Sequence, residues 1–335
     1  MGSISVLDCT LRDGGYVNNW SFGQEAICGV IGGLEEAGVN ILELGFLRNE
    51  PFNKDRTAFS SIEDVNRLIV EKKPNVIYSA MIEAFNPYDL DILSPKVPNG
   101  VDIIRVCIWK RLMKEHFEYC EQVKRKGYPI SIQPSRVEQY NKDEFLELLK
   151  RTNDIHPFSF YIVDTWGTQS SSHIQWYAEL AEKHLDSDIR IGYHGHNNKM
   201  QALSCAEKFL TMGLTHDLCV DASLRGMGRG AGNLCTEVIM DYLNEIHGKN
   251  YNVFKAVDTY RDYVDPIYKE HPWGYSLYYY LASAIGVNPN FPTYFSENNY
   301  SIESFERFLD SLSEQEKIVF SPTFVESRLN EMKIK

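Results

Sequence analysis

The stretch Arg190-Ile191-Gly192-Tyr193-His194-Gly195-His196 begins as a short apolar run and ends in two histidines. Side chains at positions i and i+2 of an extended segment point the same way, so His194 and His196 can present two imidazoles to one divalent ion. Strands that end in chemically active side chains are typical of (β/α)8 barrels, which build their active sites at the carboxyl ends of the strands. The same order, a short apolar run and then polar residues, recurs along the chain.

Eight short β-branched or apolar runs predict strands, at residues 4–8, 40–44, 76–81, 103–108, 130–133, 160–163, 190–193 and 218–221. Segments of helical period lie between most of them, at residues 23–37, 62–71, 112–126, 142–151, 172–184, 199–212 and 233–246. The connection between the third and fourth runs is the weakest, because prolines interrupt it. Eight strands joined by crossover segments predict an α/β fold, the (β/α)8 TIM barrel.

A doubly wound parallel sheet is the alternative architecture. The barrel is favoured because unusual polar residues fall at the ends of different predicted strands; these are Arg12, Asp13, Glu43, Arg105, Asp164, His194 and His196. From about residue 251 the sequence becomes aromatic-rich and helical. We therefore expect a TIM-barrel catalytic domain over residues 1–250 and a mainly helical C-terminal extension over residues 251–335.

The aromatic residues of the extension allow two interpretations. In one, most of them form the small core of the extension itself. In the other, the extension is a lid over the barrel mouth, and we expect Tyr275 to contact the substrate from it.

The composition narrows the classes of partner. Lys and Arg number 34 against 46 Asp and Glu, for a net charge of -12, which disfavours nucleic acid and anionic membrane surfaces as partners. A small anionic substrate would then need a locally positive site. The seven cysteines are scattered singly, with no CxxC pair and no secretory leader, and no apolar run approaches the roughly 18 residues of a membrane span, so we expect a cytoplasmic protein.

A carboxylate from the start of the chain would complete a metal site with the two histidines. Asp13 is our choice, because it follows the first predicted strand in a glycine-rich turn. Two His and one Asp leave positions open for a bidentate substrate such as a 2-oxo acid. Each half alone allows a simpler interpretation: His194 and His196 as a hydrogen-bonded pair, and Arg12 with Asp13 as a salt bridge.

Several motifs together resemble a known family, in their order and spacing. They are Leu7-Asp8-Cys9-Thr10-Leu11-Arg12-Asp13-Gly14-Gly15, Ile41-Leu42-Glu43-Leu44-Gly45, Val163-Asp164-Thr165, Gly192-Tyr193-His194-Gly195-His196-Asn197-Asn198 and Gly226-Met227-Gly228-Arg229-Gly230-Ala231-Gly232-Asn233. The family is the metal-dependent TIM-barrel lyases, which include hydroxymethylglutaryl-CoA lyase, isopropylmalate and homocitrate synthases, and 4-hydroxy-2-oxovalerate aldolase. The chain looks most like the aldolase branch, across roughly residues 1–250.

The resemblance implies that Asp13, His194 and His196 are ligands of Mn²⁺ or Mg²⁺. It also implies that Arg12 stabilises an enolate oxygen and that Glu43 orients this arginine. The chemistry agrees, because cleavage of a carbon–carbon bond next to a ketone passes through an enolate, whose charge a cation and a guanidinium can stabilise.

Further site residues follow from the same resemblance. Asn233 matches a residue that approaches the metal in some members, although it could instead be a helix N-cap after Gly232. The loop at residues 226–232, with Gly228 at its centre, would offer backbone N–H groups to a substrate carboxylate. Arg105 and Thr165 are the other residues that we expect to bind substrate.

The chain departs from the family at three points. Tyr16 stands where the aldolases carry a histidine base, so the base is Tyr16 with a phenol pKa lowered by a nearby cation, or a metal-bound water, or Tyr16 merely packs at the barrel rim. Arg229 stands in the glycine loop where no thiol is available, which disfavours CoA-ester cleavage by that route. Lys110 could form a Schiff base as in metal-independent aldolases, although a surface or anion-binding lysine is the simpler interpretation.

We therefore expect a divalent-metal-dependent aldolase, a carbon–carbon lyase that cleaves or forms a small 4-hydroxy-2-oxo acid through a pyruvate enolate, with an aldehyde as the second product. An acyl-CoA-dependent condensing synthase of the isopropylmalate or homocitrate type, or a non-catalytic metal-binding scaffold subunit, are the alternatives. A homo-oligomer and an aldehyde dehydrogenase partner are both compatible with the chain.

Overall fold

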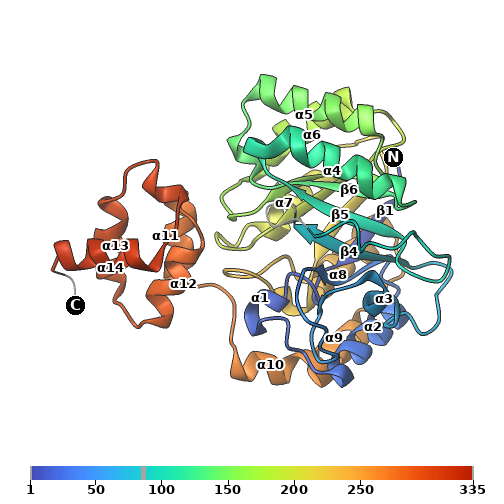
Figure 1. The fold of residues 1–335 in the computed structure, drawn as a ribbon, viewed down its shortest axis with the longest axis horizontal. Coiled ribbons are helices and arrows are strands. Elements are labelled where there is room, and N and C mark those ends of the chain that lie inside the picture. Colours follow the sequence, from blue (N-terminus) through green and yellow to red (C-terminus); the bar gives the residue numbers. More distant parts are fainter. Residues whose placement is uncertain (1, 84–87, 334–335) are drawn as a thin grey trace.

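Eight parallel strands close into a barrel in the computed structural model, which describes residues 2–83 and 88–333 (Figure 1). The strands are β1 Ile4–Asp8, β2 Ile41–Leu47, β4 Ile77–Glu83, β5 Ile103–Ile108, β6 Ile130–Pro134, β7 Ser159–Asp164, β8 Arg190–Gly195 and β9 Leu218–Ala222. Neighbours pair in chain order, and β1 closes the barrel by pairing with both β2 and β9. The predicted TIM barrel with a C-terminal helical extension is confirmed. A two-residue strand, β3 Ala58–Phe59, adds to the end of β2 and was not predicted.

Helices cover the outside of the barrel between most strands. They are α2 Gln24–Ala37, α3 Ile62–Asn66, α4 Met113–Arg125, α5 Lys142–Ile155, α6 Ser171–His184, α7 Ala202–Thr211 and α8 Thr236–His247. The predicted helix at residues 62–71 is wrong beyond Asn66, where α3 ends after little more than one turn. Within the described residues 88–102, between β4 and β5, there is no helix, in keeping with the prolines there.

The strands are buried on both faces, as parallel strands inside a helical ring must be. All seven residues of β2 are buried, including the charged Glu43 in its middle. Arg105 lies in the middle of β5 and is also fully buried. The inside of the barrel therefore holds charges in addition to apolar side chains, and a buried charge requires a partner.

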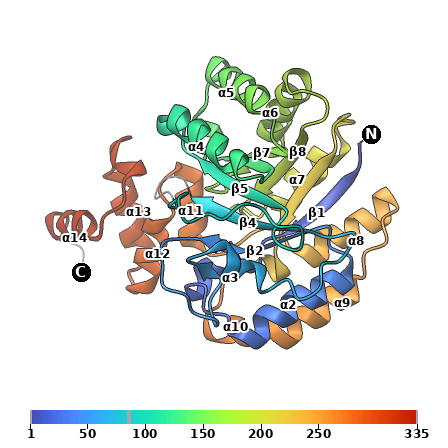
Figure 2. The same ribbon diagram turned by 45° about the vertical axis from the view of Figure 1, so that its right-hand side comes forward.

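The first part of the extension packs against the barrel. The helix α9 Val253–Thr259, a π-helical turn at Tyr260–Val264 and α10 Asp265–Glu270 follow α8, and α9 lies beside α2 in Figure 2. The two helices come close because Gly33 of α2 has no side chain where Thr259 sits.

The last four helices form a small unit with a core of its own. They are α11 Leu277–Ile285, α12 Asn290–Glu297, α13 Ile302–Asp310 and α14 Pro322–Glu331 (Figure 1, red end of the chain). Phenylalanines fill this core, at Phe291, Phe295, Phe305 and Phe308. This unit, which we call the C-terminal unit (residues 276–333), contacts the barrel through the Ser283 hydroxyl, which donates to the Trp166 carbonyl oxygen at 2.7 Å. Among the described residues, no helix is long and apolar enough to cross a membrane.

Candidate active site

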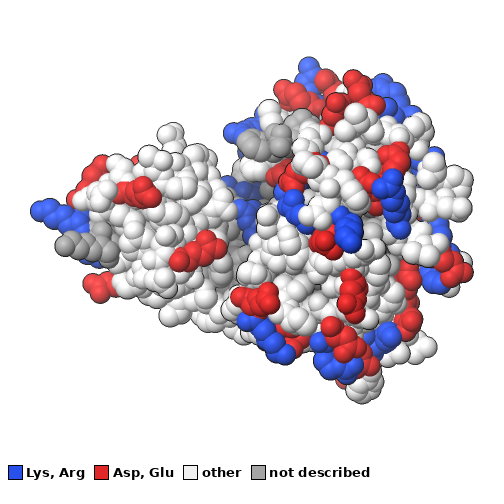
Figure 3. All heavy atoms as spheres, turned by 60° about the horizontal axis from the view of Figure 1, so that its bottom comes forward, with Lys and Arg blue, Asp and Glu red and all other residues white. Residues whose placement is uncertain are grey.

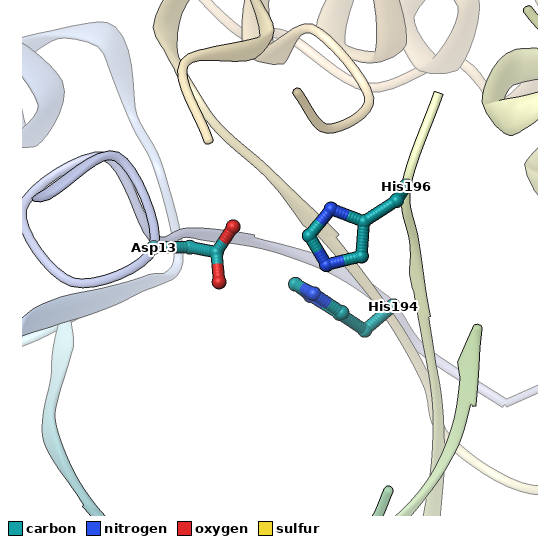
Figure 4. A group of neighbouring side chains, drawn as sticks. All are labelled: Asp13, His194 and His196. Carbon is teal, nitrogen blue, oxygen red and sulfur yellow. The ribbon is translucent and has the colours of Figure 1, made fainter. Parts of the chain in front are cut away.

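Three buried side chains converge at the carboxyl end of the barrel: Asp13, His194 and His196 (Figure 4). One ligand atom from each lies within 4.8 Å of the other two. Asp13 stands in the turn after β1, where the Cys9 carbonyl oxygen accepts hydrogen bonds from the backbone N–H groups of Arg12 and Asp13 at 3.0 and 2.8 Å. His194 lies near the end of β8 and His196 directly follows its last residue, Gly195, so the two side chains point the same way.

Hydrogen bonds fix how the two imidazoles are turned. His194 Nδ1 lies 3.0 Å from Asp221 Oδ2, and His196 Nδ1 lies 3.2 Å from the Arg229 carbonyl oxygen. These contacts engage Nδ1 and leave Nε2 of both rings for a metal ion, as outer partners do at metal sites. Burial is the largest cause that lowers the pKa of His196, to about 4, which keeps this imidazole neutral and able to act as a ligand.

The third ligand, Asp13, is held ionised. Burial alone would raise its pKa, but the Arg12 guanidinium and the two neighbouring imidazoles outweigh burial and hold the pKa well below its usual range. Asn233 Nδ2 donates to Asp13 Oδ2 at 2.9 Å, whereas Asn233 Oδ1 is buried with no hydrogen-bond partner among the described residues. This oxygen is therefore available as a further metal ligand beside the side chains of Asp13, His194 and His196. The alternative that Asn233 is a helix N-cap is wrong, because α8 begins at Thr236 with Cys235 as its N-cap.

A chain of buried ion pairs supports the ligands from inside the barrel. Arg12 pairs with Asp13 and, at 2.7 Å, with Glu43 Oε2. Arg105 Nη1 contacts the same Glu43 oxygen at 2.9 Å, and Arg105 also pairs with Asp221. Two cations and three carboxylates leave one net negative charge in a buried place, which favours a bound cation. The donor set and its charge therefore fit a divalent ion.

A cavity of about 430 Å³ opens above these residues, between the barrel and the C-terminal unit. Its lining includes Asn288, Asn290, Ile318 and Val319 of that unit. Five cationic side chains and only two carboxylates line it: Arg12, Lys110, Arg111, Arg136 and Arg229 against Asp13 and Glu83. In Figure 3, acidic and basic side chains are interspersed over the barrel face, and basic ones lie where the barrel meets the C-terminal unit. The cavity is thus locally positive in a chain of net charge -12, which suits a small anionic ligand.

Tyr16, Thr165 and Lys110 line this cavity. Desolvation of the phenol raises the pKa of Tyr16, and Arg229 offsets this only in part. A phenol pKa lowered by a further cation stays a prediction. Thr165 Oγ1 accepts the backbone N–H of Arg136 at 2.8 Å. Lys110 Nζ contacts Glu144 Oε2 at 2.6 Å and the Gln139 carbonyl oxygen at 2.7 Å, as expected for an ion-pairing lysine.

Three residues that we expected to bind substrate lie outside the cavity lining. Arg105 is 0% exposed inside β5 and holds Glu43 and Asp221. Gly228 is buried, and a Cβ there would lie 2.7 Å from Asp13 Oδ2, so the position requires glycine for the close approach of the loop. Tyr275 is 52% exposed and its ring lies near that of Tyr280. That these three residues bind substrate therefore stays a prediction, which their positions outside the cavity lining do not support.

The sequence analysis did not identify two residues of the candidate site. Asp221, which orients His194, ends a predicted strand, and a carboxylate that follows a buried β-branched run was the available signal. Arg136, which stacks over the Trp166 ring at 3.2 Å at the cavity wall, had no signal in the local sequence.

The chain is similar to known proteins in sequence and in structure. Residues 107–261 match the HMGL-like family model. The chain is 26% identical to an oxaloacetate decarboxylase of Mycobacterium tuberculosis over 70% of this chain and 68% of that protein, and 25% identical to a 4-hydroxy-2-oxovalerate aldolase of Thermomicrobium roseum over 80% and 74%. A solved structure of the N-terminal domain of a Bacteroides vulgatus protein, assigned without proof of activity as an aldolase, is 25% identical with a TM-score of 0.74, over 90% of this chain and 99% of that one.

Proposed function

We propose that this chain, an enzyme that carries an HMGL-like domain, is a divalent-metal-dependent carbon–carbon lyase that acts on a small 2-oxo acid. The observation that carries the proposal is the convergence of Asp13, His194 and His196 beside the Arg12 guanidinium at the floor of a locally positive cavity. Cleavage of a 4-hydroxy-2-oxo acid into pyruvate and an aldehyde, or the reverse condensation, is the reaction that we favour.

Asp13, His194 and His196 would hold the metal, with Asn233 Oδ1 as a further donor. Bound there, Mn²⁺ or Mg²⁺ would supply Lewis-acid polarisation of the substrate's ketone group. Arg12 donates through Nε and Nη1 to Glu43 and Asp13, and Nη2 has no hydrogen-bond partner among the described residues. This N–H group can donate to the ketone oxygen as negative charge develops on it, which is where electrostatic help lowers the barrier.

The proposed cleavage requires one proton to leave the substrate and one to be added. In cleavage, the 4-hydroxyl loses its proton, the bond between C3 and C4 breaks, its electron pair moves to the ketone oxygen, and C3 is then protonated. Tyr16 lines the cavity with a raised pKa, so it is a neutral phenol near pH 7 and can donate a proton to the aldehyde oxygen in the condensation direction.

Decarboxylation of a 3-carboxylated 2-oxo acid is the second candidate reaction, because a relative is named oxaloacetate decarboxylase. It breaks a bond at the same carbon and moves the electron pair to the same oxygen. The acyl-CoA synthase, the imine mechanism at Lys110 and the scaffold subunit remain alternatives, and a homo-oligomer, a dehydrogenase partner and a cytoplasmic location remain predictions.

Exchange of the pyruvate methyl protons in deuterated water, followed by NMR, tests the proposal without knowledge of the aldehyde. We expect chelation to abolish exchange, Mn²⁺ to restore it, and His194→Ala to lose both metal and exchange. His184→Ala, at an exposed histidine at the end of α6, is the matched control and should retain both.

Three results would contradict the proposal. Unchanged metal content in His194→Ala would show that the metal does not bind at the proposed site. A borohydride-trapped adduct of pyruvate on Lys110 would favour the imine mechanism. Bound metal without exchange would favour the synthase, which releases a free thiol from an acyl-CoA, or the scaffold, which does not.

A further inference from the structure

Arg229 differs in its partners from three of the other four cations that line the cavity. Three of the lining cations contact carboxylates: Arg12 with Glu43, Lys110 with Glu144 at 2.6 Å, and Arg136 with Glu138 at 2.8 Å. Among residues 2–83 and 88–333, the Arg229 guanidinium has no carboxylate within ion-pair distance. Arg229 therefore contributes an unneutralised positive charge to this cavity wall.

The backbone of Arg229 is fixed to the metal ligands. Its N–H donates to Asp13 Oδ2 at 3.4 Å, and its carbonyl oxygen lies 3.2 Å from His196 Nδ1. The same carbonyl oxygen accepts the N–H of Gly232 at 3.0 Å, which closes the loop on itself. The guanidinium therefore stands about one side-chain length from the metal ligands, and the spacing between the two is set by the fold.

The side chain of Arg229 reaches toward the C-terminal unit. Its Nη2 donates to Asn290 Oδ1 at 2.7 Å, and its guanidinium carbon lies 5.5 Å from the centre of the Tyr16 ring. Asn290 is the first residue of α12 and also lines the cavity. Both partners are neutral, so the guanidinium keeps its charge and most of its five N–H donors for a ligand.

We infer that Arg229, held in place by Asn290, is a specificity-determining residue that binds a second carboxylate of the substrate, beyond its 2-oxo acid group. The inference rests on the proposed function, which places the 2-oxo acid group of the substrate beside Asp13 and His196. The second carboxylate is at the opposite end of the substrate. One guanidinium matches one carboxylate in charge and in planar two-pronged geometry, whereas a phosphate dianion would remain partly uncompensated. The substrate class is thus a dicarboxylic 2-oxo acid, and the C-terminal unit helps to select it.

Two ligands of equal length test this inference: 2-oxoglutarate and 2-oxopentanoate, which share five carbons and the 2-oxo acid group and differ only in a terminal carboxylate or methyl group. Calorimetric titration of the Mn²⁺-loaded and of the metal-free protein measures their affinities. We expect the wild type to bind 2-oxoglutarate about 10- to 100-fold more tightly, the range of a hydrogen bond to a charged group.

Four variants locate the effect. Arg229→Gln should lose the preference and retain its affinity for 2-oxopentanoate, and Arg229→Lys should keep part of the preference because it keeps the charge without the fork. Asn290→Ala should weaken the preference by releasing the guanidinium. Arg151→Gln is the matched control, since Arg151 pairs with Glu147 on α5 and does not line the cavity, and it should keep the preference. Circular dichroism checks that each variant is folded.

Equal affinities of the wild type for the two ligands, absence of 2-oxoglutarate binding, or an equal loss for both ligands in Arg229→Gln would overturn the inference. Pyruvate proton exchange tests the lyase separately. A preference for 2-oxoglutarate without proton exchange would support the second carboxylate site and contradict the lyase activity. Proton exchange without the preference would support the lyase activity and contradict the second carboxylate site.

Discussion

Replacement of Asp221 by Asn tests whether the buried ion pairs tune the metal site. Asp221 Oδ2 accepts from His194 Nδ1 at 3.0 Å and from Arg105, while Oδ1 has no hydrogen-bond partner among the described residues. An asparagine can keep an acceptor in the place of Oδ2, so the side chain fits but the charge is lost. The cluster of Arg12, Arg105, Asp13, Glu43 and position 221 then becomes neutral, and its attraction for a cation falls.

The expected magnitude follows from these contacts. Loss of an outer partner of a metal-bound imidazole weakens metal affinity by about 10- to 100-fold, or about 1.4–2.7 kcal/mol. Removal of one partner of a buried ion pair costs about 3–5 kcal/mol of stability. We expect the lower end of that range, because Glu43 still contacts Arg105 at 2.9 Å.

Calorimetric titration of the metal-free protein with Mn²⁺ measures the affinity, and thermal unfolding followed by circular dichroism measures the stability. Asp217→Asn is the matched control, because it removes one carboxylate from an exposed position directly before β9 and should leave Mn²⁺ affinity unchanged. A folded Asp221→Asn variant that binds Mn²⁺ within about twofold of the wild type would refute the reasoning that the outer partner tunes the site.

Three further predictions concern the turn after β1, the glycine loop and a buried carboxyl group. Arg12→Lys should keep the fold and the metal and lose about 10²- to 10³-fold in turnover, because a point charge cannot reproduce the guanidinium's contacts; near-normal turnover would make Arg12 structural. Gly228→Ala should cost about 1–3 kcal/mol in unfolding free energy and weaken Mn²⁺ binding, because its Cβ would press on Asp13, whereas Gly32→Ala in α2, where a Cβ meets nothing within 4 Å, should not. Burial raises the pKa of Asp8 from 3.8 to about 6, so the folded state binds this proton more tightly than the unfolded state between those values. Denaturant titrations should show the wild type losing stability relative to Asp8→Asn as pH rises from about 4 to about 6, and parallel pH curves would contradict this.

Much of the fold was available from local sequence patterns. The runs at Ile4–Asp8 and Ile103–Ile108 were located to the residue, and the alternation of strands with helical segments sufficed for the barrel. Local patterns failed where an element is too short to carry a period, as in β3 Ala58–Phe59, or where the helix ends early, as in α3. For the candidate site, the spacing of His194 and His196 on one strand anticipated that both rings face one point, since that depends on the strand period alone.

Other features of the site were decided only by the tertiary structure. Arg105 was expected at the substrate, and the closed barrel instead places it against Glu43 and Asp221, because strand register determines which mid-strand side chains meet inside. The contact between Arg229 and Asn290 joins residues 61 positions apart on the glycine loop and α12. The period of the apolar residues predicts which face of a single helix or strand is buried. These pairings depend instead on the closure of the barrel and on the packing of the C-terminal unit against it. The sequence by itself therefore determined the barrel and which side chains share a strand face, and the tertiary structure decided which charges meet.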